Sequence, residues 1–238
     1  MSETILITGV GKRLGFALAQ QLLADGYQVI GTFRSEYPQL QQLRDKGADL
    51  QYVDFYQQSS VEDFLHYVGQ EHRALRAIVH NASDWKPENK KDPSENASEI
   101  MNQMLAVHVG VPYLINLSLK DLLMSGEQTA DIIHISDYVA EKGSKKHIAY
   151  AASKAALNNL TLSFSAMLAP KVKVNTVSPA MIKFNDHDDE AYKAKALQKA
   201  LIPAEAGFEE VVDGIKYVLA SRYMTGRTLH LDGGRHLK

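Results

Sequence analysis

The sequence predicts an α/β fold, a Rossmann-type doubly wound sheet of about seven parallel strands with helices on both faces. Short apolar, β-branched stretches alternate with longer amphipathic stretches along the whole chain, as strands alternate with helices in such folds. A glycine-rich turn, TGVGKRLG at residues 8–15, stands at the first junction. The 238 residues, of which 45% are hydrophobic, suffice for one large core, so we expect residues 1–238 to form a single domain.

Each predicted strand is a short run rich in β-branched or aromatic residues. The runs are 4–8, 27–33, 49–55, 75–80, 130–136, 171–179 and 228–234. Each predicted helix has apolar residues at helical spacing, and the first ends near Gly26. The helices are 13–26, 37–47, 60–72, 96–126, 148–170 and 208–221. This alternation implies parallel pairing, right-handed crossovers and a ligand site at the carboxyl ends of the strands.

Three polar segments, 84–96, 137–147 and 180–200, follow the predicted fourth, fifth and sixth strands. All three lie on the carboxyl side of the sheet, so we expect them to border one crevice. The first two are lysine-rich and are either part of this crevice or plain solvated surface. The third is long enough to serve as a lid over a substrate.

Composition and charge exclude several classes of function. The chain has 26 Lys and Arg against 28 Asp and Glu, a formal net charge of −2, whereas nucleic-acid-binding proteins are usually basic. It has no cysteine, hence no disulfide or thiolate metal site, and we assign no metal. The N-terminus lacks the features of a signal peptide, and no apolar run approaches the roughly 20 residues of a membrane span. We therefore expect a soluble cytoplasmic protein without nucleic-acid or membrane partners.

The glycines of residues 8–15 permit a tight turn before a helix whose free amides and positive dipole suit a pyrophosphate. The second predicted strand ends in Arg34 and Ser35, where an NAD enzyme typically has an acidic residue for the ribose hydroxyls. With Lys12 nearby, these residues suit a 2′-phosphate instead. The sequence therefore predicts NADP(H) as the cofactor.

YAASK places Tyr150 and Lys154 four residues apart, on one face of a predicted helix. An ammonium near a phenol favours the phenolate and lowers the pKa of the tyrosine. Such a tyrosine can pass a proton while a nicotinamide passes a hydride. The spacing alone is common, and it is the place after the fifth strand of a dinucleotide-binding fold that indicates catalysis.

The sequence resembles the short-chain dehydrogenase/reductase family over essentially its whole length. The motifs TGVGKRLG, HNAS (80–83), YAASK (150–154), VSPA (177–180) and DGG (232–234) occur in the family's order. The resemblance implies that Tyr150 is the catalytic acid or base and that Lys154 binds the nicotinamide ribose. It also implies that Asn81 and Ala82 shape the cofactor pocket and that the backbone at 179–182 holds the carboxamide.

Three departures narrow the resemblance to the pteridine reductases. Most of the family has a serine thirteen residues before the catalytic tyrosine, where this sequence has Asp137, and Ser136 should face the other way on a strand. Arg13 replaces the middle glycine of the turn, and Trp85 stands two residues after HNAS. DYVAEKGSKKHIAYAASKAAL and LDGGRHLK are similar to the dihydromonapterin reductases of bacteria. This resemblance implies NADPH-dependent reduction of the N5=C6 bond of a dihydropterin by a homo-oligomer, a tetramer or a dimer.

The chemistry of a dihydropterin, 7,8-dihydromonapterin with dihydrofolate as a second substrate, agrees with these residues. Trp85 offers a face to the flat ring, and stacking of this kind is worth roughly 1–3 kcal/mol. The guanidinium of Arg13 can span the pyrophosphate and the pterin edge. Asp137 beside Tyr150 can hold and hand on the proton that reduction of an imine needs.

The predicted site therefore has three groups of residues. The catalytic residues are Tyr150, Lys154 and Asp137. The cofactor-binding residues are Gly9, Lys12, Arg13, Leu14, Arg34, Ser35, Asp54, Phe55, Asn81, Ala82, Ser83, Tyr150, Lys154, Pro179, Ala180, Met181 and Ile182. The substrate-binding residues are Arg13, Ser83, Trp85, Asp137 and Tyr150.

Four residues have a second interpretation. Trp85 is alternatively a buried loop anchor, Arg13 a plain phosphate contact and Asp54 a simple turn residue. His108 stands where the family often has an asparagine that supports a water chain from the lysine, and it either replaces that asparagine or is structural.

Two other functions stay open. A general carbonyl or 3-oxoacyl reductase is disfavoured because Asp137 removes the hydroxyl that polarises a carbonyl. A catalytically silent NADP(H)-sensing protein is disfavoured because Tyr150 and Lys154 are intact.

Overall fold

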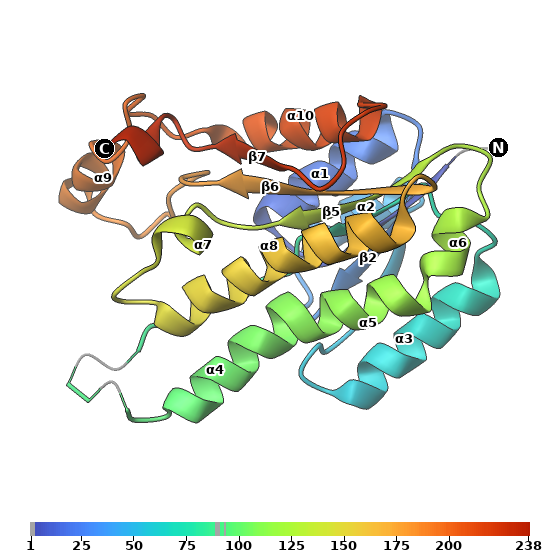
Figure 1. Ribbon diagram of the computed structural model, residues 1–238, viewed down its shortest axis with the longest axis horizontal. Helices are drawn as coiled ribbons and strands as arrows, with labels where there is room; N and C mark the ends of the chain where they lie inside the picture. Colours follow the sequence, from blue (N-terminus) through green and yellow to red (C-terminus); the bar gives the residue numbers. More distant parts are fainter. Residues whose placement is uncertain (1–2, 89–90, 93) are drawn as a thin grey trace.

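The computed structural model describes residues 3–88, 91–92 and 94–238 (Figure 1). Seven parallel strands form one sheet in the order β3-β2-β1-β4-β5-β6-β7, which confirms the predicted fold class. The strands are β1 (Thr4–Ile7), β2 (Gln28–Phe33), β3 (Asp49–Tyr52), β4 (Ala77–His80), β5 (Ala130–Ile135), β6 (Val172–Pro179) and β7 (Thr228–Leu231). The strand order changes direction between β1 and β4, where Ile5 pairs with Ala77, and a doubly wound fold opens its ligand crevice at this point.

Helices cover both faces of the sheet. They are α1 (Arg13–Ala24), α2 (Leu40–Asp45), α3 (Gln58–Glu71), α4 (Ala97–Leu105), α5 (Val111–Ser118), α6 (Lys120–Met124), α7 (Val139–Lys142), α8 (Ile148–Leu168), α9 (Glu190–Leu197) and α10 (Gly207–Ala220), with the π-helix η1 (Ala106–Gly110) and the 3-10 helix η2 (Arg235–Leu237). Successive strand residues supply the two cores. Ile5 and Ile7 pack with α1 and α10, whereas Leu6 packs with α3, α5 and α8, as side-chain alternation along a strand requires.

The predicted helix 96–126 is not one regular helix, and this expectation was wrong in detail. A π-helical turn interrupts it at Ala106–Gly110, and a second break at Leu119 separates α5 from α6. Pro112 has no N–H to donate to the residue four places earlier, so regular α-helical bonding is lost beside this turn. π-turns inside helices occur frequently at functional sites.

The polar segments also contain structure that the sequence did not reveal. The short helices α7 and α9 lie within 137–147 and 180–200, and they gather with the C-terminus at one end of the molecule (Figure 1). The predicted absence of a signal peptide concerns a segment whose residues 1–2 are outside the described residues. The predicted polar segment 84–96 includes 89–90 and 93, which are also outside them.

Among the described residues, one helical stretch has the length and composition of a membrane span. It covers Ala97–Ser118 and includes Glu99, Asn102 and Gln103, so it is not an uninterrupted apolar run. Core helices of globular folds pass the same test, and this one places Met104 and Ile115 in the interior.

Candidate active site

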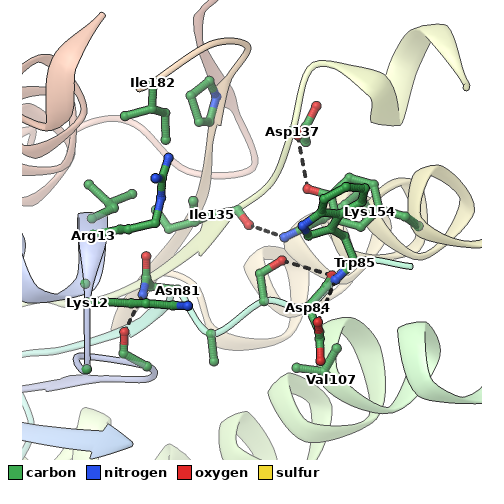
Figure 2. A pocket seen from close by; sticks show the side chains of 18 of the residues that line it. Lys12, Arg13, Asn81, Asp84, Trp85, Val107, Ile135, Asp137, Lys154 and Ile182 are labelled. Atoms are coloured by element: carbon green, nitrogen blue, oxygen red, sulfur yellow. Dashed lines mark hydrogen bonds between the residues drawn. The ribbon is translucent and has the colours of Figure 1, made fainter. Parts of the chain in front are cut away.

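A cavity of about 740 Å³ opens at the carboxyl edge of the sheet, next to the point where the strand order changes. All of the predicted site residues except Asp54 line it. Figure 2 shows Lys12 and Arg13 on one side of this cavity and Asp137, Lys154 and Trp85 on the other. The fold therefore brings together residues from seven separate segments of the chain, as the motif order predicted.

The glycine-rich turn fits a dinucleotide phosphate. Gly9 has a φ of +76°, and a Cβ there would lie 2.9 Å from the Cα of Ala82. A Cβ on Gly15 would lie 2.1 Å from the backbone oxygen of Gly9. Among the described residues no side chain caps the start of α1, and its first turn has no acidic residue. The free backbone amides at the start of α1 thus face the cavity, and the glycines let an anion come close to them, as anion binding requires.

Arg13 tethers the long segment after β6. It has a φ of 53°, and its guanidinium donates to Asn185 Oδ1 at 3.0 Å and to the backbone oxygen of Lys183 at 2.6 Å. The same group lies 5.6 Å from the ring centroid of Phe208. In this arrangement Arg13 holds the candidate lid segment, a contact that neither sequence interpretation included. Its contacts with pyrophosphate and pterin stay predictions.

The cation at the end of β2 has a carboxylate partner. Arg34 Nη2 lies 3.4 Å from Asp84 Oδ2, and its guanidinium lies 5.1 Å from the ring centroid of Tyr56. The Tyr56 hydroxyl donates to the same carboxylate oxygen at 3.0 Å. Burial and the charge of Asp84 raise the pKa of Tyr56 to about 12, so the phenol keeps its proton. Sequence reasoning missed Tyr56, which follows β3 in no recognisable motif.

Asp54 has a local role. Its backbone amide bonds Ser60 Oγ, and its carboxylate accepts from the backbone amide of Tyr56 at 3.1 Å and from Gln57 at 3.2 Å. These bonds form the turn that begins α3, and Asp54 is outside the cavity lining. Asp54 therefore acts as a turn residue, and its contact with the cofactor stays a prediction, whereas Phe55 does line the cavity.

Tyr150 and Asp137 form a hydrogen-bonded pair. The phenol donates to Asp137 Oδ2 at 3.0 Å, and the other carboxylate oxygen accepts from the amide of Val139 at 2.9 Å. Burial raises the pKa of the carboxyl group of Asp137. Ser136 follows the end of β5 and also lines the cavity, and its Oγ lies 3.5 Å from the backbone oxygen of Lys154.

The expectation that Lys154 lowers the pKa of Tyr150 was wrong. Burial, and then the charge of Asp137, raise the pKa of Tyr150 well above its usual value. The ammonium of Lys154 donates to the backbone oxygen of Ile135 at 2.9 Å (Figure 2) and lies 5.7 Å from the phenol ring centroid. Burial lowers the pKa of Lys154 to about 8. Tyr150 is therefore held as a protonated phenol.

Trp85 stands at the mouth of the cavity. It is 61% exposed, so it is not a buried anchor. Its ring centroid lies 4.8 Å from that of His147, with an edge-to-face angle of 69°, and its backbone amide donates to Asp84 Oδ1 at 2.9 Å. One carboxylate therefore contacts both Arg34 and the Trp85 backbone.

Comparison with known proteins identifies the family. The family model described as enoyl-(acyl carrier protein) reductase matches residues 9–236. The chain belongs to the short-chain dehydrogenase/reductase family. It is 48% identical over 235 residues to a dihydromonapterin reductase of Klebsiella pneumoniae subsp. pneumoniae, covering 98% of this chain and 97% of that protein. It is 46% identical over 238 residues to a dihydromonapterin reductase of Escherichia coli O6:H1, covering 100% and 98%.

Solved structures share the fold of this short-chain dehydrogenase/reductase. Alternative dihydrofolate reductase 1 from Brucella canis, complexed with NADP, gives a TM-score of 0.87 at 21% identity over 99% of this chain and 94% of that one. Acetoin dehydrogenase from Salmonella typhimurium gives 0.85 at 22% identity over 100% and 97%.

This member of the short-chain dehydrogenase/reductase family departs from the common pattern at His108, which is buried beside the site. Its Nε2 lies 2.8 Å from Ser83 Oγ, and its Nδ1 lies 2.8 Å from Ser153 Oγ. Its ring meets that of Tyr150 edge-on, with centroids 5.3 Å apart. Sequence reasoning flagged His108 and missed Ser153, although Ser153 lies within YAASK.

Proposed function

We propose that this protein reduces a dihydropterin with NADPH, converting 7,8-dihydromonapterin to tetrahydromonapterin, with dihydrofolate as a second substrate. The observation that carries the proposal is the contact of Tyr150 Oη with Asp137 Oδ2 at 3.0 Å in the cavity. A carboxyl group here suits protonation of a ring nitrogen, whereas a hydroxyl suits polarisation of a carbonyl. The two relatives with 46–48% identity that are named dihydromonapterin reductases support the same substrate class.

The assignment of NADPH rests on the glycine-rich turn, which fits a pyrophosphate, and on the positive charge of Arg34, which suits a 2′-phosphate. NADPH, when bound, supplies a hydride for C6 of the pterin. The amides at the start of α1 are free to hold its pyrophosphate, and Lys154 can bond its ribose. Arg34 is half exposed at 49%, and a 2′-phosphate would offer it a stronger partner than the carboxylate of Asp84.

The proton follows a path through the chain's own residues. Reduction adds a hydride to C6 and a proton to N5, so the net consumption is one NADPH and one proton per dihydropterin. The phenol of Tyr150 donates a buried hydrogen bond to Asp137, and two groups coupled this closely titrate as a pair. We infer that the pair delivers the proton to N5 and recovers it from solvent. Trp85, at the mouth, supplies the face on which the pterin stacks.

One experiment separates this function from its alternatives. NADPH oxidation is followed in parallel with a dihydropterin, dihydrofolate and an acetoacetyl thioester. We expect the dihydropterin to give the highest kcat/KM. A preference for the thioester would assign a 3-oxoacyl reductase, and tight NADPH binding without turnover of any substrate would assign a cofactor sensor.

We further infer a single-domain, cytoplasmic homo-oligomer, a dimer or tetramer. Large apolar side chains lie exposed on the outer surfaces of the helices α4, α5 and α8, which a partner subunit would cover. They are Leu105, Tyr113, Leu114, Ile148, Leu162 and Met167. Light scattering coupled to size-exclusion chromatography tests the assembly, and a monomer at micromolar concentration would contradict it.

A further inference from the structure

His108 lies in the π-turn between α4 and α5 and is only 1% exposed. Each of its ring nitrogens faces a hydroxyl group. Nε2 is 2.8 Å from Ser83 Oγ, in the cavity wall, and Nδ1 is 2.8 Å from Ser153 Oγ, on the helix that carries Tyr150. The direction of these two hydrogen bonds can be worked out from the remaining partners.

The proton of the Ser153 hydroxyl is already used. Ser153 Oγ lies 2.7 Å from the backbone oxygen of Tyr150, and a carbonyl oxygen can only accept. Because a hydroxyl has a single proton, Ser153 has none left for the imidazole and must accept one from it. Nδ1 of His108 therefore carries a hydrogen.

The other ring nitrogen carries none. Burial, and then the charge of Lys154, lower the pKa of His108 to about 2, although a hydrogen bond with the backbone of Met104 opposes the shift. The ring is therefore neutral at physiological pH, and a neutral imidazole has one N–H. Nε2 must accept its hydrogen bond from Ser83. The contact of Ser83 Oγ with the backbone oxygen of Asp84 is 3.5 Å long and too weak to compete. Ser83 also interacts with the phenol of Tyr150, but a Ser83 proton directed there would leave Nε2 of His108 without a donor.

We propose that His108 determines substrate specificity by holding the proton of Ser83 and turning the Ser83 hydroxyl into a hydrogen-bond acceptor toward the cavity. The inference rests on the proposed function. Asp137, which accepts a hydrogen bond from the Tyr150 phenol, is a second acceptor on the same cavity wall. A substrate edge with N–H groups, as a dihydropterin has, can donate to both. A carbonyl oxygen cannot bond the Ser83 hydroxyl in this orientation, and a site left with an unpaired polar group rejects such a ligand strongly.

The tautomer is testable without any substrate. We expect two-bond 15N–1H correlation spectra of the full chain between about pH 6 and 8 to show His108 as the neutral Nδ1–H form. A neutral Nε2–H form or a charged ring would overturn the proposal. This measurement does not depend on turnover, so it is separate from a failure of the proposed function, which would appear as a parent enzyme that does not reduce dihydropterins.

The effect on specificity is tested with His108→Asn. An amide can donate an N–H to Ser83 Oγ and so release the serine proton toward the cavity. We expect Kd and KM for a dihydropterin to rise about tenfold or more, since one hydrogen bond is lost and an acceptor becomes a donor. Trp85 is the only tryptophan of the chain, so its fluorescence reports pterin binding. His66→Asn, on the exposed surface of α3, is the matched control.

A double-variant comparison isolates the path through Ser83. Ser83→Ala should weaken pterin binding by a similar factor, and the double variant should lose no more than either single variant, because both changes remove one interaction. Ser83→Ala also carries the test if the asparagine variant does not fold. Losses that multiply in the double variant, or a His108→Asn protein that binds the pterin within about twofold of the parent, would overturn the proposal.

Discussion

The phenolic hydroxyl of Tyr150 donates to Asp137 across 3.0 Å, and burial raises the pKa of both groups. Because the pKa of Tyr150 is raised, the pair keeps its phenolic proton at neutral pH, and the raised pKa of Asp137 favours uptake of a second one. Proton storage beside a hydride-transfer site is what reduction of a ring imine needs. The pH dependence of the reaction therefore belongs to the pair.

Asp137→Ser is expected to lower kcat/KM for a dihydropterin by at least tenfold, about 1.4 kcal/mol of transition-state stabilisation. Serine is smaller and fits without overpacking, but it cannot store a proton. The parent should lose activity as pH rises through the raised pKa of the pair, because the stored proton is lost. The pH–rate profile of the serine variant should lack this fall in activity. Both proteins should decline above about pH 8, where Lys154 becomes neutral. Profiles from about pH 5 to 9 check this, and coinciding profiles would remove Asp137 from the mechanism.

Tyr150→Phe is expected to lower turnover of a dihydropterin by ~10²–10⁴-fold, the usual contribution of a positioned acid. The phenol ring packs against His108, and phenylalanine keeps this contact, so NADPH affinity should change little. Steady-state kinetics and NADPH fluorescence titration on the same preparation test both statements. Turnover within a few-fold of the parent would contradict the assigned role.

Arg34→Ala is expected to weaken NADPH binding far more than NADH binding. Hydrogen bonds to a charged group are worth about 1.5–3 kcal/mol, or roughly 10- to 150-fold in Kd. Arg44→Ala is a suitable control, because Arg44 pairs with Glu36 on the surface and does not line the cavity. Equal losses for the two cofactors would mean that Arg34 does not read the 2′-phosphate.

Trp85→Ala is expected to raise KM for a dihydropterin by roughly 5- to 150-fold, the equivalent of 1–3 kcal/mol of stacking, with unchanged NADPH affinity. Since Trp85 is 61% exposed, the melting temperature should barely move. Tyr223→Ala, a fully exposed aromatic residue away from the cavity, controls for loss of a surface ring. A lower melting temperature with an unchanged KM would restore the loop-anchor interpretation.

Asp131→Asn is expected to destabilise the fold by about 3–5 kcal/mol without changing kcat/KM under native conditions. The buried carboxylate of Asp131 on β5 pairs with both Arg76 and Lys173, so its removal leaves two cations uncompensated. Denaturant unfolding measures the loss. Asp121→Asn, at an exposed pair with Lys120, should change stability by no more than about 0.5 kcal/mol. A similar effect of the two substitutions would show that the triad adds nothing.

The sequence by itself determined the order of the elements and the chemistry of the site. Strand and helix periods involve neighbours within a few residues, so the alternation, the glycine turn and the shared face of Tyr150 and Lys154 follow from local spacing. The glycine-rich turn, with Arg34 and Ser35, indicated the cofactor, and Asp137 indicated the substrate class. These inferences needed no knowledge of which segments meet.

Only the tertiary structure decided how these groups behave. The pKa of Tyr150 rises because packing removes water from the phenol, a desolvation effect that spacing cannot report. His108 takes its role from Ser83 and Ser153, which are 25 and 45 residues away along the chain. Arg34 meets Asp84, which is 50 residues away along the chain. Such contacts depend on the relative positions of packed elements, and hydrogen-bond direction and burial are determined only when the segments have come together.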